Sequence, residues 1–118
     1  MLQRRYRLRL SSDIQQVRQD GRSWRHPLII LLVKANQNDV SRFAFVVGRR
    51  IGNAVVRNRC KRLMREAVRQ HLNEIEAGWD MVLIARSPLT AVSYHDVETA
   101  VLKLLTRANL FHTQRTSA

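Results

Sequence analysis

A dense series of arginines in the middle of the chain is the feature whose residue types and spacing are best suited to chemistry. The stretch 48–70, GRRIGNAVVRNRCKRLMREAVRQ, holds eight Arg or Lys residues and one acid, Glu66. At about 100° per residue, a helix through this stretch gathers its basic side chains on one flank and its apolar side chains on the next. The basic flank consists of Arg57, Lys61, Arg65 and Arg69, with Arg62 at its margin; the apolar flank consists of Cys60, Leu63, Met64, Ala67 and Val68. A guanidinium is always charged and its fork matches two phosphate oxygens, so this flank is suited to binding phosphate.

The alternative interpretation of a charged helix face is that it is simply solvated. Solvated faces usually interleave Glu with Lys or Arg to gain i,i+4 pairs. Here only Glu66 does so, placed to meet Arg62 and Arg69. Because uncompensated like charge lowers stability, a polyanionic partner is the better explanation.

Composition supports the same class of partner. The 118 residues are 45% hydrophobic, which predicts one folded domain over 1–118. The 21 basic and 9 acidic residues give a formal net charge of +12, which indicates nucleic acid or an anionic membrane surface. No apolar run approaches the roughly 18 residues of a membrane span, and the basic helix carries no Trp or Phe to insert into lipid. One cysteine and an N-terminus without an apolar signal region favour a reducing, cytoplasmic location.

Several elements must position the arginine helix. Residues 1–10 alternate basic and apolar side chains and predict an extended, flexible basic arm. Ser12 and Gln15 resemble a capping box that opens a short helix over 13–19, ended by Gly21. Residues 22–26 form a loop or a short edge strand. After Pro27, LIILLVK predicts a buried strand.

The second long strand covers 42–47, with Phe43, Phe45 and Val47 on one face and Ala44 and Val46 on the other. A hairpin over the turn 36–41 is the natural connection between these two strands. The arginine helix then runs over 55–77, with Gly78 as its C-terminal cap.

A third strand follows over 81–85. The last helix begins after Ser93, which pairs with Asp96 in a capping box, and the tail 113–118 is expected to fray. The core stripe of that helix consists of Val97, Ala100, Val101, Leu104, Leu105 and Ala108. The order α-β-β-α-β-α predicts an α+β two-layer sandwich of helices on a small mixed sheet.

One long segment also resembles a known family. Arg49-Arg50-Ile51-Gly52-Asn53-Ala54-Val55-Val56-Arg57-Asn58-Arg59, continued by Cys60-Lys61-Arg62-Leu63-Met64-Arg65-Glu66, is similar to the signature of the bacterial ribonuclease P protein component. The match is long and ungapped, and the flanking elements agree over about residues 4–111. The resemblance implies a ribosomal-protein-like fold with a left-handed β-α-β crossover, an exception to the usual right-handed rule.

The resemblance also implies a function. It implies the protein subunit of a ribonucleoprotein that removes 5′ leaders from precursor tRNAs, in which the RNA subunit with Mg²⁺ performs the hydrolysis. The expected partners are the catalytic RNA and precursor tRNA, with neither a membrane nor a small-molecule substrate. Carried over residue by residue, the positions expected to face RNA are Arg49, Arg50, Arg57, Asn58, Arg59, Lys61, Arg62 and Arg65, with Arg69 on the same flank.

In that family the leader lies in a cleft between the first helix and the sheet. The two-residue period of a strand lets the sheet contribute one apolar face opposite Phe43 and Phe45. The expected cleft residues are Ile14 and Arg18 from the helix and Ile30, Leu32, Ala44 and Val46 from the sheet. The family often has aromatic residues at the positions of Ile14, Arg18 and Leu32, so here shape, apolar contact and arginine are expected to replace stacking.

The sequence offers little chemistry of its own, and no catalytic or metal-binding residue is predicted. The acids form no tight cluster of the kind a two-metal nuclease needs. The four histidines lack metal-ligand spacing, and Cys60 is interpreted as a core residue. Trp24 is either a loop anchor or a stacking platform, and Phe43 and Phe45 are expected in the core. A ribosome-type RNA-binding protein and a self-sufficient nuclease stay open as alternative functions.

Overall fold

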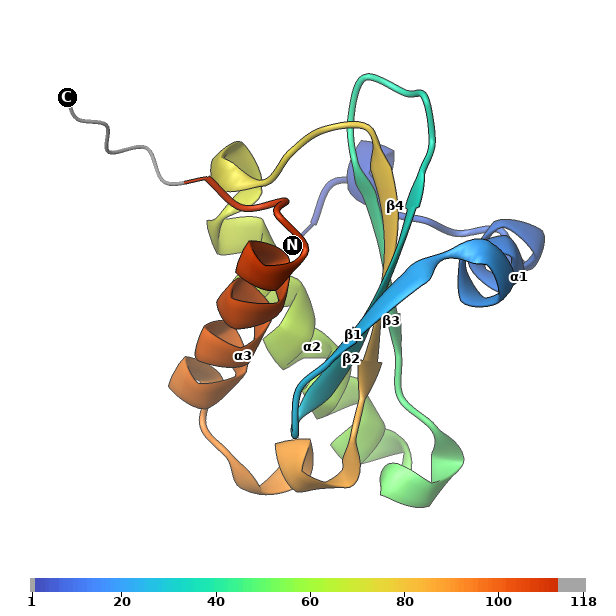
Figure 1. Cartoon of the computed structure of the whole chain (residues 1–118). Helices are drawn as coiled ribbons and strands as arrows, with labels where there is room; N and C mark the ends of the chain where they lie inside the picture. Colours follow the sequence, from blue (N-terminus) through green and yellow to red (C-terminus); the bar gives the residue numbers. More distant parts are fainter. Residues whose placement is uncertain (1, 113–118) are drawn as a thin grey trace, which may run out of the picture.

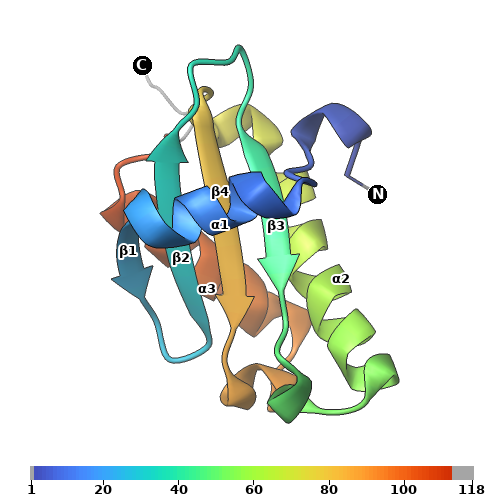
Figure 2. The ribbon, with the colours of Figure 1, turned by 90° about the vertical axis from the view of Figure 1, so that its right-hand side faces the viewer.

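The chain builds one mixed sheet with helices on both of its faces (Figures 1 and 2). The computed structural model describes residues 2–112, so the predicted fraying of 113–118 lies outside the described residues. Four strands form the sheet: β1 (Arg22–Arg25), β2 (Ile29–Ala35), β3 (Arg42–Val46) and β4 (Trp79–Ala85). The α-helices of the described residues are α1 (Ser11–Asp20), α2 (Ala54–Gln70) and α3 (Tyr94–Arg107). Short 3-10 turns lie at Arg4–Tyr6, Arg49–Ile51, Leu72–Glu74 and Ser87–Ala91.

The strand order corrects one prediction. The sheet order is β1-β2-β4-β3, with β1–β2 and β2–β4 antiparallel and β3–β4 parallel. The predicted hairpin between β2 and β3 is therefore wrong, because β4 lies between them. β4 buries almost its whole length, which suits a central strand. The loop after β2 instead crosses the end of β4, where Asn36 Nδ2 donates to Asp80 Oδ1 at 2.8 Å.

The connection from β3 through α2 to β4 is a β-α-β unit between parallel neighbours. Seen from the α2 side with both strands pointing up, β4 lies to the left of β3, so the crossover is left-handed (Figures 1 and 2). The handedness that the family resemblance implied is therefore present. It leaves α2 beneath β3, at one edge of the sheet, with its outer surface uncovered by α3.

The main core lies between the sheet and the α2–α3 pair. The odd-numbered side chains of β2, β3 and β4, such as Leu31, Phe43 and Leu83, pack there against Met64 of α2 and Leu104 of α3. These residues are almost fully buried. The α+β class and the sheet-plus-helices layering are as predicted, and α1 adds a partial cover that crosses the opposite face (Figure 2).

The last helix follows its sequence closely. The Ser93 side chain accepts from the Asp96 N–H and Asp96 accepts from Ser93, which is the predicted capping box. Five of the six predicted stripe residues are buried, and Ala108 is partly exposed. Residues 22–25 form an edge strand, one of the two predicted alternatives.

The arginine helix is shorter than predicted. Asn53 caps it, with Oδ1 accepting from the Val56 N–H at 3.0 Å, but the helix ends at Gln70 rather than Ala77. After His71 the chain turns so that Ile75 is buried, and the Glu76 N–H bonds to the Leu110 carbonyl at 2.8 Å. These contacts with the residues that follow α3 replace further helical bonds. Gly78 is therefore no C-terminal cap; it has φ +93° just before β4.

The N-terminal region also differs from its prediction. The extended arm is wrong for residues 2–10, because Leu2 and Leu8 are buried and residues 4–6 form a 3-10 turn. The Leu8 N–H bonds to the Phe43 carbonyl at 2.8 Å, which attaches the segment to the free edge of β3. α1 starts at Ser11 after Leu10 without a side-chain cap, so the predicted capping box of Ser12 and Gln15 is absent.

Candidate nucleic-acid interface

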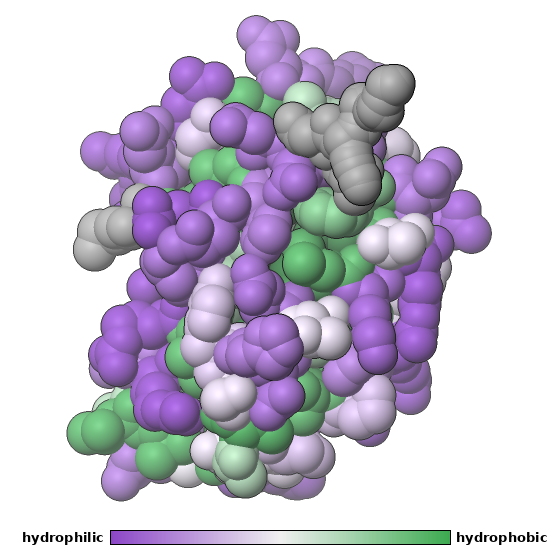
Figure 3. Space-filling view, turned by 90° about the vertical axis from the view of Figure 1, so that its left-hand side faces the viewer, coloured by the Kyte–Doolittle hydropathy of each residue, from purple (hydrophilic) through white to green (hydrophobic). Residues whose placement is uncertain are grey.

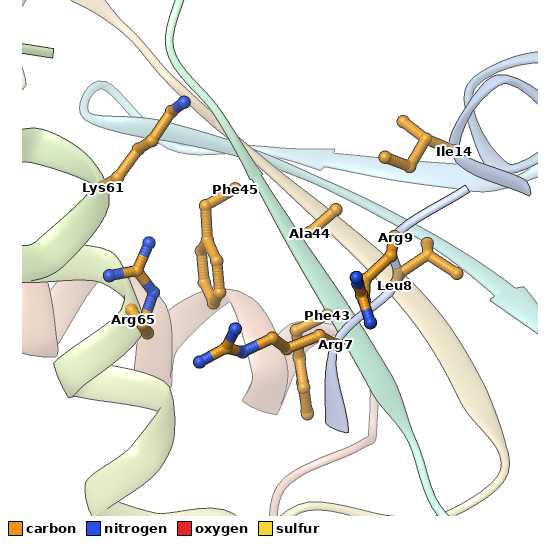
Figure 4. A pocket seen from close by; sticks show the side chains of 9 residues that line it. All are labelled: Arg7, Leu8, Arg9, Ile14, Phe43, Ala44, Phe45, Lys61 and Arg65. Carbon is orange, nitrogen blue, oxygen red and sulfur yellow. The ribbon is translucent and has the colours of Figure 1, made fainter. Parts of the chain in front are cut away.

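The N-terminal segment, α1, β3 and α2 together enclose an open cleft of about 330 Å³ (Figure 4). Its lining residues are Arg7, Leu8, Arg9, Ile14, Phe43, Ala44, Phe45, Lys61 and Arg65. The attachment of the N-terminal segment to β3 creates the cleft, because it faces α2 across the edge of the sheet. The cleft therefore joins residues from three separate stretches of the sequence, 7–14, 43–45 and 61–65.

Two walls of this cleft are cationic. Arg7 and Arg9 come from the N-terminal segment, and Lys61 and Arg65 come from the flank of α2. Figure 4 shows Arg7 and Arg65 extending toward each other from opposite walls. Arg7 Nε donates to the Leu2 carbonyl at 2.9 Å, which holds it in place. None of the described residues that line the cleft is acidic, so the cleft favours an anion between its walls.

Next to these walls lies an apolar sheet surface. Strand register aligns Leu32, Val82 and Ala44 in one row across β2, β4 and β3. It aligns Ile30, Ile84 and Val46 in the next row. Both rows lie on the face opposite Phe43 and Phe45, as the two-residue period predicted.

The helix α1 covers part of this surface. Leu8, Val17, Ala44 and Val82 form a buried cluster, with Ile14, Leu32, Val46 and Ile84 packed against it. The structure therefore brings together four of the six predicted cleft residues, and register adds Ile30 to the same face. Arg18 is exposed on α1 and is not among the residues that line the cleft.

The two sides of α1 differ in charge. Arg18 follows Ile14 by about 40° around the helix, on the side of the second apolar row. Asp13 lies on the other side, 4.0 Å from Arg42. That side meets a polar row in which register pairs Asp80 with Lys34 and Arg42. Acidic and basic side chains balance on the Asp13 side, so a polyanion is favoured on the Ile14 side of α1 instead.

The predicted RNA-facing residues divide into two groups. Arg57, Lys61 and Arg65 are partly buried, and the last two line the cleft. The remainder are exposed, namely Arg49, Arg50, Asn58, Arg59, Arg62 and Arg69. Along α2, basic side chains therefore lie both in the cleft and outside it.

Arg69 is the member of this set with an acidic partner. Its guanidinium donates to both carboxylate oxygens of Glu66, at 3.0 and 2.7 Å, and Gln70 donates to the same group at 2.8 Å. The hydrogen bonds from Arg69 and Gln70 lower the pKa of Glu66 to about 2. Of the two partners predicted for Glu66, Arg69 is thus the one it contacts.

Sequence reasoning missed part of the site. Arg7, Leu8 and Arg9 were assigned to a flexible arm, although their basic-apolar alternation is also the pattern of a strand at a sheet edge. Phe45 was expected in the core, yet it is only partly buried and lines the cleft, with the Arg65 guanidinium 5.9 Å from its ring centroid. Both aromatic residues that line the cleft, the buried Phe43 and the partly exposed Phe45, therefore lie on β3 rather than on α1.

The other reactive residue types are occupied elsewhere. Cys60 is fully buried, and burial raises the pKa of its thiol. His71 lies between Glu74 at 2.7 Å and Glu98 at 2.8 Å. Trp24 packs against the main core with one side still exposed, which makes it an anchor of β1. Within residues 2–112, no group of three or more His, Cys, Asp or Glu side chains could hold a metal ion, and no helix is long and apolar enough to cross a membrane.

Fold and site together define a small, strongly basic α+β protein with a cationic cleft beside an apolar sheet face. Comparison with known proteins places this class more narrowly. The family model for ribonuclease P matches residues 2–109, and the chain belongs to that family. It is 44% identical to the ribonuclease P protein component of Roseiflexus castenholzii over 110 residues, which cover 92% of this chain and 90% of the relative. It is 40% identical to that of Herpetosiphon aurantiacus over 111 residues, which cover 94% and 90%.

Solved structures show the same fold. The RNase P protein of Staphylococcus aureus superimposes with a TM-score of 0.84 at 28% identity, covering 91% of this chain and 98% of that one. The RNase P protein of Thermotoga maritima gives 0.80 at 35% identity, covering 86% and 96%. The left-handed β3-α2-β4 arrangement therefore belongs to a fold already seen in bacterial RNase P proteins.

Proposed function

We propose that this chain is the protein subunit of a ribonuclease P holoenzyme that binds a catalytic RNA and the 5′ leader of precursor tRNA. The holoenzyme removes the leader by endonucleolytic hydrolysis, and the RNA subunit carries the chemistry. The observation that carries the proposal is the cleft between the N-terminal segment and α2. Its cationic walls and adjoining apolar surface match a single RNA strand, whose phosphates and bases need different surroundings.

The leader lies along the Ile14 side of α1. Its phosphates contact Arg9, Lys61 and Arg65, and its bases contact the rows that end in Ala44 and Val46. Phe45 offers a ring at the α2 end of this path, while Ile14 supplies apolar contact. Arg18 meets the strand farther along α1, through a phosphate or through its planar guanidinium.

The catalytic RNA binds the outward side of α2. Arg59 and Arg62 are exposed there, and Arg49 and Arg50 are exposed in the turn that precedes the helix. Because these side chains point away from the cleft, the helix can contact both RNAs at once. Asn58 is exposed on the same helix and supplies the RNA with a polar contact that does not depend on charge.

The hydrolysis is assigned to the RNA subunit with Mg²⁺. Several carboxylates are already bonded to protein cations: Asp80 to Arg42, Glu66 to Arg69, and Glu74 and Glu98 to His71. The described residues therefore offer no converging set of free oxygen ligands, which Mg²⁺ prefers. The protein's own residues bind and orient RNA, and their cytoplasmic location follows from the same role.

Cleavage of precursor tRNA with and without the RNA subunit tests this assignment. With Mg²⁺ present, we expect no cleavage by the protein alone and cleavage at the mature 5′ end when the cognate RNA is added. Specific cleavage by RNase-free protein alone would favour the self-sufficient nuclease. A protein that binds structured RNA but does not improve leader removal by the RNA subunit would favour the ribosome-type alternative.

The cleft itself is tested with Lys61→Gln, which removes one cationic wall residue. Its affinity for precursor tRNA in the holoenzyme should fall, and the salt dependence of log K should weaken by roughly 0.7 per lost single-strand phosphate contact. Affinity for leaderless tRNA should change much less. Equal losses for both tRNAs would place Lys61 outside the leader path.

A further inference from the structure

A second basic cluster lies at the opposite edge of the sheet from α2. Four segments contribute to this cluster: β1, the turn after β1, the residue after β4, and α3. Its members are Arg22, Trp24, His26, Arg86, Lys103 and Arg107, which we call the β1–α3 edge. All of these residues except Trp24 and His26 are exposed. Figure 3 views the α3 side of the molecule and shows hydrophilic residues along its right-hand margin, the side on which β1 lies.

Hydrogen bonds hold two of these cations in place. Arg107 Nη1 donates to the Arg25 carbonyl at 2.7 Å, and Arg86 Nη1 donates to the His26 carbonyl at 3.3 Å. The two guanidiniums are therefore fixed against successive residues of the same turn. Each guanidinium has five N–H donors, so one bond to a carbonyl leaves others for a ligand.

The neighbouring side chains extend the cluster along β1. Register pairs Arg22 with Val33 and Trp24 with Leu31, which places both on the α3 face of the sheet. The Arg22 guanidinium lies 5.4 Å from the centroid of the Trp24 ring. Burial lowers the pKa of His26, and the nearby charges of Lys103 and Arg107 lower it further. Aromatic and basic groups thus alternate on one surface, as they do in many nucleic-acid sites.

This cluster has no acidic compensation among the described residues. The ion pairs found within 2–112 involve Arg42, Arg69, His71 and His112, and none involves a residue of the β1–α3 edge. If Arg86 and Arg107 served only to hold the backbone, an uncharged hydrogen-bond donor to each carbonyl would be enough. It would also leave Lys103 and Arg22 without a role.

We propose that the β1–α3 edge binds the phosphate backbone of a second RNA segment, apart from the segments bound by α2 and the cleft. The partner class rests on the proposed function, since RNA is the polyanion that a ribonuclease P subunit meets. Three strand spacings of about 4.8 Å separate β1 from β3, so one phosphate cannot contact both sites. The segment belongs either to the catalytic RNA or to the body of the tRNA, and both present the same phosphate chemistry.

An alternative role for charge on an edge strand is to prevent pairing with another sheet edge. The two roles predict different results. Protection of the edge predicts self-association when the charge is removed, with RNA affinity unchanged. RNA binding predicts weaker affinity and a smaller salt dependence, with the protein still monodisperse.

The experiment compares Lys103→Gln with Lys34→Gln in the reconstituted holoenzyme. Lys34 faces the α1 side of the sheet and belongs neither to the cleft nor to the β1–α3 edge. Its variant therefore controls for the loss of one unit of net charge. Affinities are measured across a salt series for the catalytic RNA alone, for mature tRNA with the holoenzyme, and for precursor tRNA with the holoenzyme. Light scattering reports self-association.

We expect Lys103→Gln to weaken the salt dependence of log K by roughly 0.7–0.9 for the arm that contacts the edge, and Lys34→Gln to leave it unchanged. A weaker salt dependence for the catalytic RNA alone would identify that RNA as the ligand of the β1–α3 edge. A weaker salt dependence for mature and precursor tRNA only would identify the body of the tRNA as the ligand. Salt dependences equal to wild type in every arm, or self-association alone, would overturn the proposal. If Lys61→Gln still weakens leader binding in that case, the proposed function stands without it.

Discussion

Asp80 is a buried carboxylate in a chain where basic residues far outnumber acidic ones. It accepts two hydrogen bonds from Arg42, at 2.9 and 2.8 Å, and one from Asn36 at 2.8 Å. The hydrogen bond that Arg42 donates to Asp80 raises the pKa of Arg42, against the effect of burial. This one residue therefore ties β4 to β3 and to the loop after β2, where the unpredicted strand order is established.

Replacement of Asp80 by Asn should destabilise the protein by leaving the Arg42 charge without its partner. The cost should be below the roughly 3–5 kcal/mol of a fully buried pair, because the Arg42 side chain is 29% exposed. Urea denaturation of the free protein measures it. Asp13→Asn is the matched control, since that carboxylate lies 4.0 Å from Arg42 and is 38% exposed. Equal losses of stability in both variants would show that the buried Asp80–Arg42 pair contributes no more than the exposed Asp13.

His71 predicts a pH dependence of stability. Burial lowers the pKa of His71, but the hydrogen bonds to Glu74 and Glu98 outweigh burial, and the net pKa is raised above 6.5. A pKa that is higher in the folded state means that the stabilisation is fully present below the unfolded value of about 6.5. It is lost as pH rises through the folded pKa.

The free energy of unfolding, measured from pH 5.5 upward, should therefore decline above about pH 6.5. The decline should be smaller in His71→Gln. His26 titrates in the opposite sense, because its pKa is lowered, so the variant must be compared with wild type at each pH. A pH profile that is identical in His71→Gln would remove His71 as its cause.

At the scale of elements, α1 and α2 each present two different sides. α2 directs Lys61 and Arg65 into the cleft and Arg59 and Arg62 away from it. α1 presents Ile14 toward the apolar sheet surface and Asp13 toward Arg42. The N-terminal segment on the edge of β3 lies between these two helices, and together they line the cleft.

Ile14→Phe tests whether the leader passes between α1 and the sheet. An aromatic ring on α1 could stack on a leader base, which is worth about 1–3 kcal/mol per base. We expect leader affinity to rise or stay unchanged, with no change for leaderless tRNA. The measurement is the ratio of dissociation constants for precursor and mature tRNA in the holoenzyme. Loss of leader discrimination with an intact fold would show that the leader does not pass Ile14.

At the scale of the whole molecule, the formal charge of +12 opposes compaction. The described ion pairs compensate only a few of the basic residues, and the cleft brings Arg7, Arg9, Lys61 and Arg65 together without an acid. Repulsion among these cations therefore destabilises the free folded protein, and a bound anion would relieve it. The protein should be more stable with RNA bound than alone, by mass action.

Simple anions should show the same effect. We expect the melting temperature of the free protein to rise more with sulfate than with chloride at matched ionic strength. Sulfate also stabilises proteins non-specifically, so the double variant Arg9→Gln, Lys61→Gln serves as the control. The extra stabilisation by sulfate should shrink in that variant. A difference between salts that is the same in both proteins would count against a preformed anion site.

Features that depend on neighbours in the sequence could be predicted from it. The alternation around Phe43 and Ala44 assigned the two faces of β3, because successive side chains point to opposite sides of a strand. Ser93 and Asp96 marked the start of α3, because a capping box involves only residues three apart. The flank of α2 and the family signature likewise follow from local spacing and residue type.

Features that depend on contacts between distant segments were decided only by the tertiary structure. β4 lies between β2 and β3 because its continuous apolar run is best buried at the centre of the sheet. α2 ends at Gln70 because the residues beyond it pair with the segment that follows α3. The N-terminal segment lies on the edge of β3 because Leu2 and Leu8 find buried positions there. That last contact brings Arg7 and Arg9 opposite Lys61 and Arg65, and no local pattern could have placed these four cations around one cleft.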